Sequence, residues 1–361
     1  MRQFYSKVKK FVEKHEDRLD TVAFVGGFAF DILTLKMADS LLDNLIVLGY
    51  LLVAALGIIT LQFYSGGKLR HNVFERIVLW IPFIIQFSFG GVMSVLVVFY
   101  AKSASIISSW PFMLLLFAIF VGNEKFRARY TRLAFQISVL YFLIFLLLIF
   151  YVPMIIGQMG SLVFLLSGLL SLIIIALFIK IIEHGRAAHV RHFFSNILIG
   201  VGSVYVLLNI LYFTNIIPPI PLSLREIQVY ESVLPKGSGY TALLDPSSEC
   251  RFCLRPSVHL PQSGQLFVYS SIFAPTTLKT GVMHEWSEYD ESSGKWIVRA
   301  RVPFSIKGGR AEGFRGYTLK SNISLGLWRV KVKTSSGQVL GRITFKVLPY
   351  NASIEALRRD L

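Results

Sequence analysis

Charged residues are scarce in this sequence, at 16% of the chain against about 25% in an ordinary soluble domain. Hydrophobic residues make up 54%, which excludes a chain that is soluble throughout. Acidic residues are scarcer than basic ones, and the net charge of +16 is of the kind that nucleic-acid-binding proteins carry. The surplus is shared equally between residues 1–221 and the remainder, and membrane topology explains it in the first part. No nucleic-acid partner is therefore expected.

Long uncharged runs occur only before Pro218-Pro219-Ile220-Pro221. A helix needs about 20 mainly apolar residues to cross a bilayer, and seven segments meet this requirement, the first and fourth being short. They cover residues 19–35, 44–64, 77–100, 106–121, 133–156, 160–182 and 193–216. The sequence thus predicts a seven-helix transmembrane domain over residues 19–221. The basic tail before it, residues 1–18, is not followed by a signal-peptide cleavage site.

Positive charges fall on one side of this predicted domain. Lys and Arg gather in the N-terminal tail and in the loops after the second, fourth and sixth segments, whereas the other loops hold only Lys36 and Lys102. Because short cytoplasmic loops accumulate these residues, the N-terminus is expected in the cytoplasm and the C-terminal domain outside. In a bacterium, this describes a multi-pass protein of the inner membrane with a periplasmic domain.

Ionisable groups inside the predicted segments are few. Asp31 lies near the outer end of the first segment, and Asp43 and Asn44 follow in the outer loop. These positions favour interfacial or packing roles over an ion pathway, which needs carboxylates at mid-depth. Three histidines of an inner loop have spacings that do not share one helical face, so neither a metal nor another cofactor is expected.

After residue 221 the pattern changes to short segments in which apolar and polar residues alternate, as in half-buried strands. Strands are predicted over residues 266–273, 281–289, 295–306, 317–322, 327–334 and 338–348, with Gly- and Ser-rich turns between them. The expected fold class is a membrane all-α helical bundle followed by an all-β antiparallel sandwich over residues 222–350. Residues 351–361 are expected to be a C-terminal tail.

Alternation assigns each predicted strand a core side and an outer side. The core side carries Trp296, Val298, Ala300, Val302, Trp328, Val330, Val332, Ile343, Phe345 and Val347. The outer side carries Arg299, Arg301, Arg329, Lys331, Lys333, Arg342 and Lys346. If these strands share a sheet, its outer side is either a basic plate for an anionic glycan or phospholipid headgroup or simply a soluble charged surface.

The segment 307–317 combines glycines with forked Arg donors and aromatic stacking surfaces. It is either a ligand-binding loop or a long hairpin connection. Together with the plate, it supplies the candidate ligand-binding residues Arg299, Arg301, Arg310, Arg315, Tyr317 and Arg329.

The only two cysteines, Cys250 and Cys253, lie in a loop context with prolines on both sides. No helix is expected to follow them and lower a thiol pKa, as a redox pair requires. Zinc would need two further ligands. A tight disulfide or unpaired loop thiols are therefore favoured over metal or redox roles.

Several strings resemble the bacterial domain of unknown function numbered 2914. They are His284-Glu285-Trp286, Pro303-Phe304-Ser305-Ile306-Lys307-Gly308-Gly309-Arg310, Gly313-Phe314-Arg315-Gly316-Tyr317, Leu327-Trp328-Arg329-Val330 and Leu340-Gly341-Arg342-Ile343. The resemblance is strongest over residues 266–347, and the membrane part is similar in residues 30–35 and 217–222. It implies a bacterial envelope protein with a polytopic membrane half and supplies no activity or catalytic residue.

Intramembrane His and Glu pairs and an activated serine, which a membrane-embedded enzyme needs, are missing from the sequence. We therefore expect a non-enzymatic inner-membrane protein whose sandwich binds an envelope partner: an anionic glycan, a lipid headgroup or a membrane protein. The alternative is a small-solute transporter or channel with the sandwich as a cap.

Overall fold

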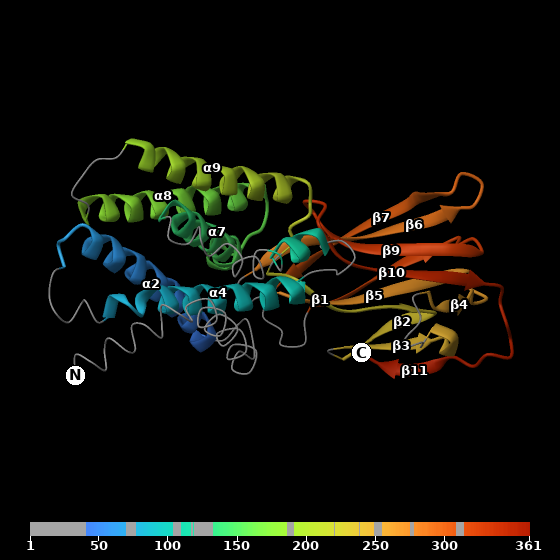
Figure 1. The fold of residues 1–361 in the computed structure, drawn as a ribbon. Helices are drawn as coiled ribbons and strands as arrows, with labels where there is room; N and C mark the ends of the chain where they lie inside the picture. The colour runs from blue at the N-terminus through green and yellow to red at the C-terminus, as the bar shows by residue number, and fades with distance from the viewer. Residues whose placement is uncertain are drawn as a thin grey trace. The chain divides into compact units, whose positions relative to one another are not determined.

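The structure is a computed structural model that describes residues 41–69, 77–103, 110–116, 118, 133–185, 191–219, 221–237, 239–248, 255–274, 278–307 and 314–361. The chain divides into two compact units, one of helices and one made mainly of Asn215–Leu361. The long helices are α2 (Leu41–Ser65), α4 (Ile81–Ser103), α7 (Leu133–Ile156), α8 (Ser161–Gly185) and α9 (Arg191–Phe213), shown in Figure 1.

Four helices of the described residues are long and apolar enough to cross a membrane. They are Asn44–Ser65, Leu133–Ile156, Ser161–His184 and Phe194–Phe213, and they correspond to the second, fifth, sixth and seventh predicted segments. In α4 the apolar stretch among the described residues is shorter, Ile81–Val97. The first predicted segment lies outside the described residues, and the fourth is described only in part. The prediction of seven spans is therefore not supported.

The four candidate spans differ in how far their side chains are buried. In α7, 67% of the apolar window is buried, against 17% in α9 and 22% in α2, so α7 forms the interior of the helical unit. Leu162 of α8 and Leu198 of α9 are 78% and 74% exposed. Large apolar side chains on the outside of a helix unit are compatible with contact to lipid rather than water.

Polar groups inside the helical unit connect helices to one another. The Tyr151 hydroxyl of α7 donates a hydrogen bond to Asn44 Oδ1 of α2 at 3.0 Å. The Ser171 hydroxyl of α8 lies 3.3 Å from the Tyr141 hydroxyl of α7. Asp43 lies within α2, and Asp31 lies outside the described residues. Asn44 thus makes a helix–helix contact of the kind expected where polar side chains meet in an apolar environment.

The second unit contains three sheets. Their strand orders are β1-β5-β8, β4-β10-β9-β6-β7 and β11-β3-β2, and β4 runs parallel to β10 whereas the other pairs are antiparallel. The strands are β1 (Ser223–Tyr230), β2 (Ser232–Lys236), β3 (Gly239–Leu244), β4 (Ser257–His259), β5 (Gln265–Phe273), β6 (Lys279–Asp290), β7 (Lys295–Lys307), β8 (Phe314–Ser321), β9 (Gly326–Thr334), β10 (Val339–Leu348) and β11 (Leu357–Asp360).

The three sheets form layers, with β1-β5-β8 in the middle (Figure 1). One side of the middle sheet, which carries Leu266 and Val268, packs against Trp286, Trp328 and Phe345 of the five-stranded sheet. Its other side packs against the third sheet through the buried side chains Tyr230, Tyr269, Val233, Ala242 and Leu244. The first pair of layers is the predicted sandwich. The third layer was not predicted, and its strand β11 lies in the segment expected to be a tail.

A buried histidine connects the two sheets of the sandwich. His284 of β6 is 0% exposed, and its ring lies 2.9 Å from the Ser270 hydroxyl of β5 and 2.8 Å from the Thr318 hydroxyl of β8. Trp286 donates its indole N–H to the same Thr318 hydroxyl at 3.1 Å. Burial lowers the pKa of His284 to about 3, so the ring is neutral at ordinary pH. The polar bridge fixes how the two sheets are aligned.

Candidate ligand-binding face of the β domain

The outer side of the five-stranded sheet carries a row of charged residues that belong to four neighbouring strands. In the strand register, Glu285 of β6 is opposite Arg301 of β7 and Lys331 of β9, and Lys331 is opposite Arg342 of β10. Residues that are opposite one another in an antiparallel pair share a face. The adjacent residue Trp286 enters the core, so this row points away from it. We call Arg301, Arg329, Lys331, Lys333, Arg342 and Lys346, with Glu285, the basic face.

One carboxylate lies within the basic face, and it is almost fully covered. Glu285 is 4% exposed, and its two oxygens accept hydrogen bonds from Lys333 Nζ at 2.6 Å and Arg301 Nε at 3.0 Å. Burial acts to raise the pKa of Glu285, but the hydrogen bonds from Lys333 and Arg301 outweigh it and hold the pKa below its ordinary value. The Glu285 carboxylate is therefore ionised and forms salt bridges with two of the six cations.

The other half of the basic face has no salt bridge to a described carboxylate, and Glu285 acts on Lys331 only through charge. Among the described residues, no carboxylate forms a salt bridge with Arg329, Lys331 or Arg342. Lys331 and Arg342 are directly opposite one another, an arrangement in which like charges destabilise a sheet. Burial, together with neighbouring cations, lowers the pKa values of both Arg329 and Lys331, and for Lys331 these effects outweigh the opposing charge of Glu285. This cluster would be stabilised by an anion from outside the chain.

Arg329 is held in place by two contacts that leave the two terminal nitrogens of its guanidinium available to a ligand. Its guanidinium lies over the ring of Trp296, 3.7 Å from the centroid. Its Nε donates to the Thr344 hydroxyl of β10 at 3.3 Å. These contacts use the flat side and the inner nitrogen of the guanidinium. The two terminal nitrogens, which bind oxyanions in a forked geometry, take part in neither contact.

A β-bulge in β7 changes which of its residues reach the basic face. Ala300 is opposite Trp286, but Val298 is opposite Ser287, so Arg299 is an extra residue between them. A bulge reverses the alternation beyond it. As a result Val298 is 42% exposed and Trp296 lies under Arg329, and the prediction that both enter the core is wrong.

Arg299 is also displaced by the bulge. Its Nε donates to Glu288 at 2.7 Å, and Glu288 is opposite Trp328, whose side chain is in the core. Arg299 therefore lies on the other side of the sheet from the basic face, at its end. Of the candidates predicted from the outer side of these strands, the structure brings Arg301 and Arg329 together and excludes Arg299.

Two further sequence candidates, Arg315 and Tyr317, do not join the basic face. Arg315 and Tyr317 belong to β8 in the middle sheet, and the Tyr317 ring packs edge-on against Tyr240 of the third sheet, with ring centroids 5.4 Å apart. Arg315 lies beside Gly239 of the same third sheet. Tyr317 thus contributes to the interior between two layers. Arg310, Cys250 and Cys253 lie outside the described residues.

Sequence reasoning missed three contributors to the basic face: Glu285, Trp296 and Thr344. Glu285 carried a signal, because it is an acidic residue two positions from Met283 and Ser287 on the outer side of an alternating strand. The roles of Trp296 and Thr344 depend on the bulge and on the β9–β10 register. Neither feature has a signature in the sequence.

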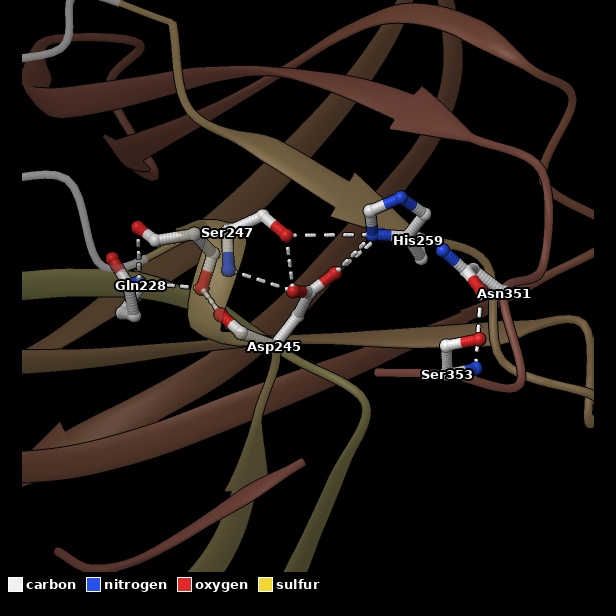
Figure 2. A network of polar contacts seen from close by, with 7 residues as sticks. Gln228, Asp245, Ser247, His259, Asn351 and Ser353 are labelled. Atoms are coloured by element: carbon white, nitrogen blue, oxygen red, sulfur yellow. Dashed lines mark hydrogen bonds and ion pairs between the residues drawn. The ribbon is translucent and has the colours of Figure 1, made fainter. Parts of the chain in front are cut away.

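A second polar cluster lies where β3 leads into β4, and its geometry argues against catalysis (Figure 2). Asp245 accepts hydrogen bonds from the Ser247 hydroxyl at 2.7 Å, the His259 backbone N–H at 2.6 Å and His259 Nδ1 at 2.9 Å. The Ser247 hydroxyl also faces Nδ1 of His259, at 3.5 Å. A serine triad needs the serine at Nε2, with the carboxylate at Nδ1.

The Asp245 cluster instead connects the segment after β3 with β4 and β1 by hydrogen bonds. Burial acts to raise the pKa of Asp245, but hydrogen bonds from His259 and Ser247 outweigh it and lower the pKa. Gln228 of β1 completes the cluster through the Ser248 carbonyl at 3.2 Å. Within the described part of the chain, no group of three His, Cys, Asp or Glu residues is arranged to hold a metal ion.

Comparisons with known proteins give little beyond the β domain. The chain is 16% identical to a β-glucosidase from Listeria innocua in complex with isofagomine, with a TM-score of 0.20; the match covers 35% of this chain and spans only 16% of the enzyme. It is 11% identical to an alkylpurine DNA glycosylase from Pseudomonas fluorescens bound to DNA containing an abasic site analog, with a TM-score of 0.22 over 86% of this chain and 100% of that one. Such low scores carry no argument about fold or function.

No curated protein matches the sequence. The family model described as "Protein of unknown function (DUF2914)" matches residues 279–347, the segment that runs from the start of β6 into β10 and carries every cation of the basic face.

Proposed function

We propose that this chain is a non-enzymatic bacterial inner-membrane protein whose periplasmic β domain binds an anionic partner of the cell envelope through the basic face. The N-terminus would lie in the cytoplasm, and apolar helices would hold the β domain at the membrane. The observation that carries the proposal is the cluster of Arg329, Lys331 and Arg342, three neighbouring cations without a carboxylate partner among the described residues.

The repulsion between the neighbouring cations Lys331 and Arg342 supports a binding role for the basic face rather than a role in solubility alone. A soluble surface is served by cations interspersed with carboxylates, and the sheet already shows that pattern at Glu285, Lys333 and Arg301. Placing Lys331 opposite Arg342 stabilises nothing within the sheet. It provides a positive potential that steers anions to this face.

The partner is an anionic glycan, a lipid headgroup or an acidic surface of a membrane protein. A small-solute transporter with a β cap was the alternative expected from the sequence. Among the described residues of the helical unit no contact favours it, because the buried polar groups described above connect helices through neutral hydrogen bonds.

The test measures binding by the full-length protein in a neutral detergent, by titration calorimetry against soluble peptidoglycan fragments and short-chain phosphatidylglycerol. One variant combines Arg329→Gln, Lys331→Gln and Arg342→Gln. The control combines Lys236→Gln, Arg299→Gln and Lys320→Gln, which removes the same charge elsewhere in the domain. We expect the first variant to lose affinity by about tenfold or more, the control to bind normally, and wild-type affinity to fall with added salt. Equal affinities in the two variants, or no binding of either probe to the wild type, would overturn the proposal.

A further inference from the structure

The surroundings of Glu285 show how many cations of the basic face bind one negative charge. The Glu285 carboxylate, with one negative charge, is held by two cations, Arg301 and Lys333. Lys331 is opposite Glu285 across the strand pair and lowers its pKa through charge, but makes no salt bridge to it. Two cations therefore make all the salt bridges of this carboxylate.

The half of the face without salt bridges, Arg329, Lys331 and Arg342, offers more positive charge over a similar area. Residues two apart on a strand lie about 7 Å from one another on the same face, and opposite residues of neighbouring strands lie about 5 Å apart. Arg329 and Lys331 have the first relation, and Lys331 and Arg342 have the second. Three cations thus surround a region the size of a single small oxyanion.

Arg329 is pre-organised to bind that oxyanion. Trp296 covers one side of the guanidinium, and Thr344 accepts its Nε–H, so the side chain loses little freedom when its terminal nitrogens engage a ligand. A forked pair of N–H donors matches two oxygens of a phosphate or carboxylate. With two further cations beside it, the total charge suits a group with more than one negative charge.

We propose that Arg329, Lys331 and Arg342 form a site for a phosphoryl group, an inference that rests on the proposed function. A phosphate monoester carries about 1.5 to 2 negative charges at neutral pH and three acceptor oxygens, whereas a carboxylate carries one charge and two oxygens. The site distinguishes the two by charge and by the number of donors. The group could be carried by a phospholipid headgroup or by a soluble phosphorylated sugar.

The experiment compares glucose 6-phosphate with glucuronate, two sugars of similar size that differ in their anionic group, as ligands of the full-length protein in neutral detergent. We expect glucose 6-phosphate to bind about tenfold more tightly, and its affinity to rise from pH 5 to pH 8 as the second phosphate proton, with a pKa of about 6, dissociates. Lys331→Gln and Arg329→Lys should each weaken glucose 6-phosphate binding markedly, since lysine lacks the fork. Arg299→Gln, which removes a cation from the opposite side of the same sheet, should leave it unchanged.

The outcomes separate this inference from the proposed function. If glucuronate binds as tightly as glucose 6-phosphate, or if only the peptidoglycan fragments bind and the triple variant abolishes that binding, the phosphoryl site is overturned while the anionic partner stands. If no anionic probe binds, both fail. Short-chain phosphatidic acid, whose headgroup is a phosphate monoester, identifies the source: tighter binding than glucose 6-phosphate supports a lipid headgroup, and weaker binding supports a soluble phosphorylated sugar.

Discussion

Two adjacent residues of β6, His284 and Glu285, are both buried, but His284 is neutral and Glu285 is ionised. His284 points into the core, where Ser270 and Thr318 hydrogen-bond with a neutral ring. Glu285 points to the basic face, where Lys333 and Arg301 hydrogen-bond with an ionised carboxylate. Burial keeps His284 neutral and the two cations keep Glu285 ionised, so each makes the stability of the domain depend on pH.

His284 should destabilise the β domain in mild acid. Its folded pKa of about 3 lies below the ordinary value of 6.5, so the unfolded chain binds the proton more readily between these values. Stability should therefore decrease as the pH falls below 6.5, by up to about 1.4 kcal/mol per pH unit. Thermal unfolding followed by tryptophan fluorescence at pH 5 to 7 should show this slope, and His284→Gln should flatten it. An equal slope in the variant would show that another group is responsible.

Removal of the Glu285 charge should lower stability and raise anion affinity together. Glu285→Gln keeps the size of the side chain but leaves Lys333 and Arg301 uncompensated, at a cost of about 1–3 kcal/mol. The same change makes the basic face more positive. Thermal unfolding and glucose 6-phosphate titration of one preparation should therefore change in opposite directions. The carboxylate's contribution, present above its unfolded pKa of 4.5, should also disappear from the acid unfolding profile. Weaker anion binding in this variant would contradict the electrostatic account of the face.

At the scale of single elements, the bulge in β7 decides how the face is built. One extra residue, Arg299, reverses the alternation of the strand. Trp296 is thereby moved from the core to the outside, where it supports Arg329. The edge strand β7 thus gives the basic face its aromatic support, and its Arg301 compensates Glu285.

Substitution of Trp328 and Trp296 should distinguish a role in the core from a role in supporting Arg329. Trp328 is 1% exposed within the core, so Trp328→Ala should cost about 3–5 kcal/mol. Trp296 lies outside the core, so Trp296→Ala should cost only about 1 kcal/mol while freeing Arg329 and weakening glucose 6-phosphate binding. Thermal unfolding and calorimetry of both variants provide the comparison. A large loss of stability in Trp296→Ala with unchanged binding would place this side chain in the core after all.

Sequence patterns predicted strands well where one side of the strand is buried and the other exposed. Each of the six predicted strands corresponds to one of β5 to β10. Five strands, β1 to β4 and β11, were missed. Three of them lack this contrast: β2 contains Pro235, β4 has three residues, and β11, with the sequence Leu357-Arg358-Arg359-Asp360, is exposed throughout. Their positions are set by pairing with distant strands, such as β11 with β3, and pairing cannot be read from local alternation.

At the scale of the whole molecule, composition predicted the division into helices and sheets but not the number of spans. Long apolar runs identify α2, α7, α8 and α9 because hydrophobicity alone defines them. The helix α4 has 23 residues, and its apolar stretch among the described residues, Ile81–Val97, is at the lower limit for crossing a bilayer. The basic face could likewise be predicted only in part. Its cations were identified from the sequence, but which of them lie next to one another depends on the strand register.

The proposed sidedness can be tested on the intact protein. Lys and Arg concentrate in the predicted inner loops, which should hold the loop after α2 in the cytoplasm and the β domain in the periplasm. In a chain with Cys250→Ser and Cys253→Ser, Ser293→Cys in the exposed β6–β7 turn should react with a membrane-impermeant maleimide in intact spheroplasts. Ser65→Cys at the end of α2 should react only after lysis. The reverse result would place the basic face in the cytoplasm, where it would meet nucleotides and nucleic acids instead of envelope ligands, so the proposed partner would have to be abandoned even if the phosphoryl site itself binds as expected.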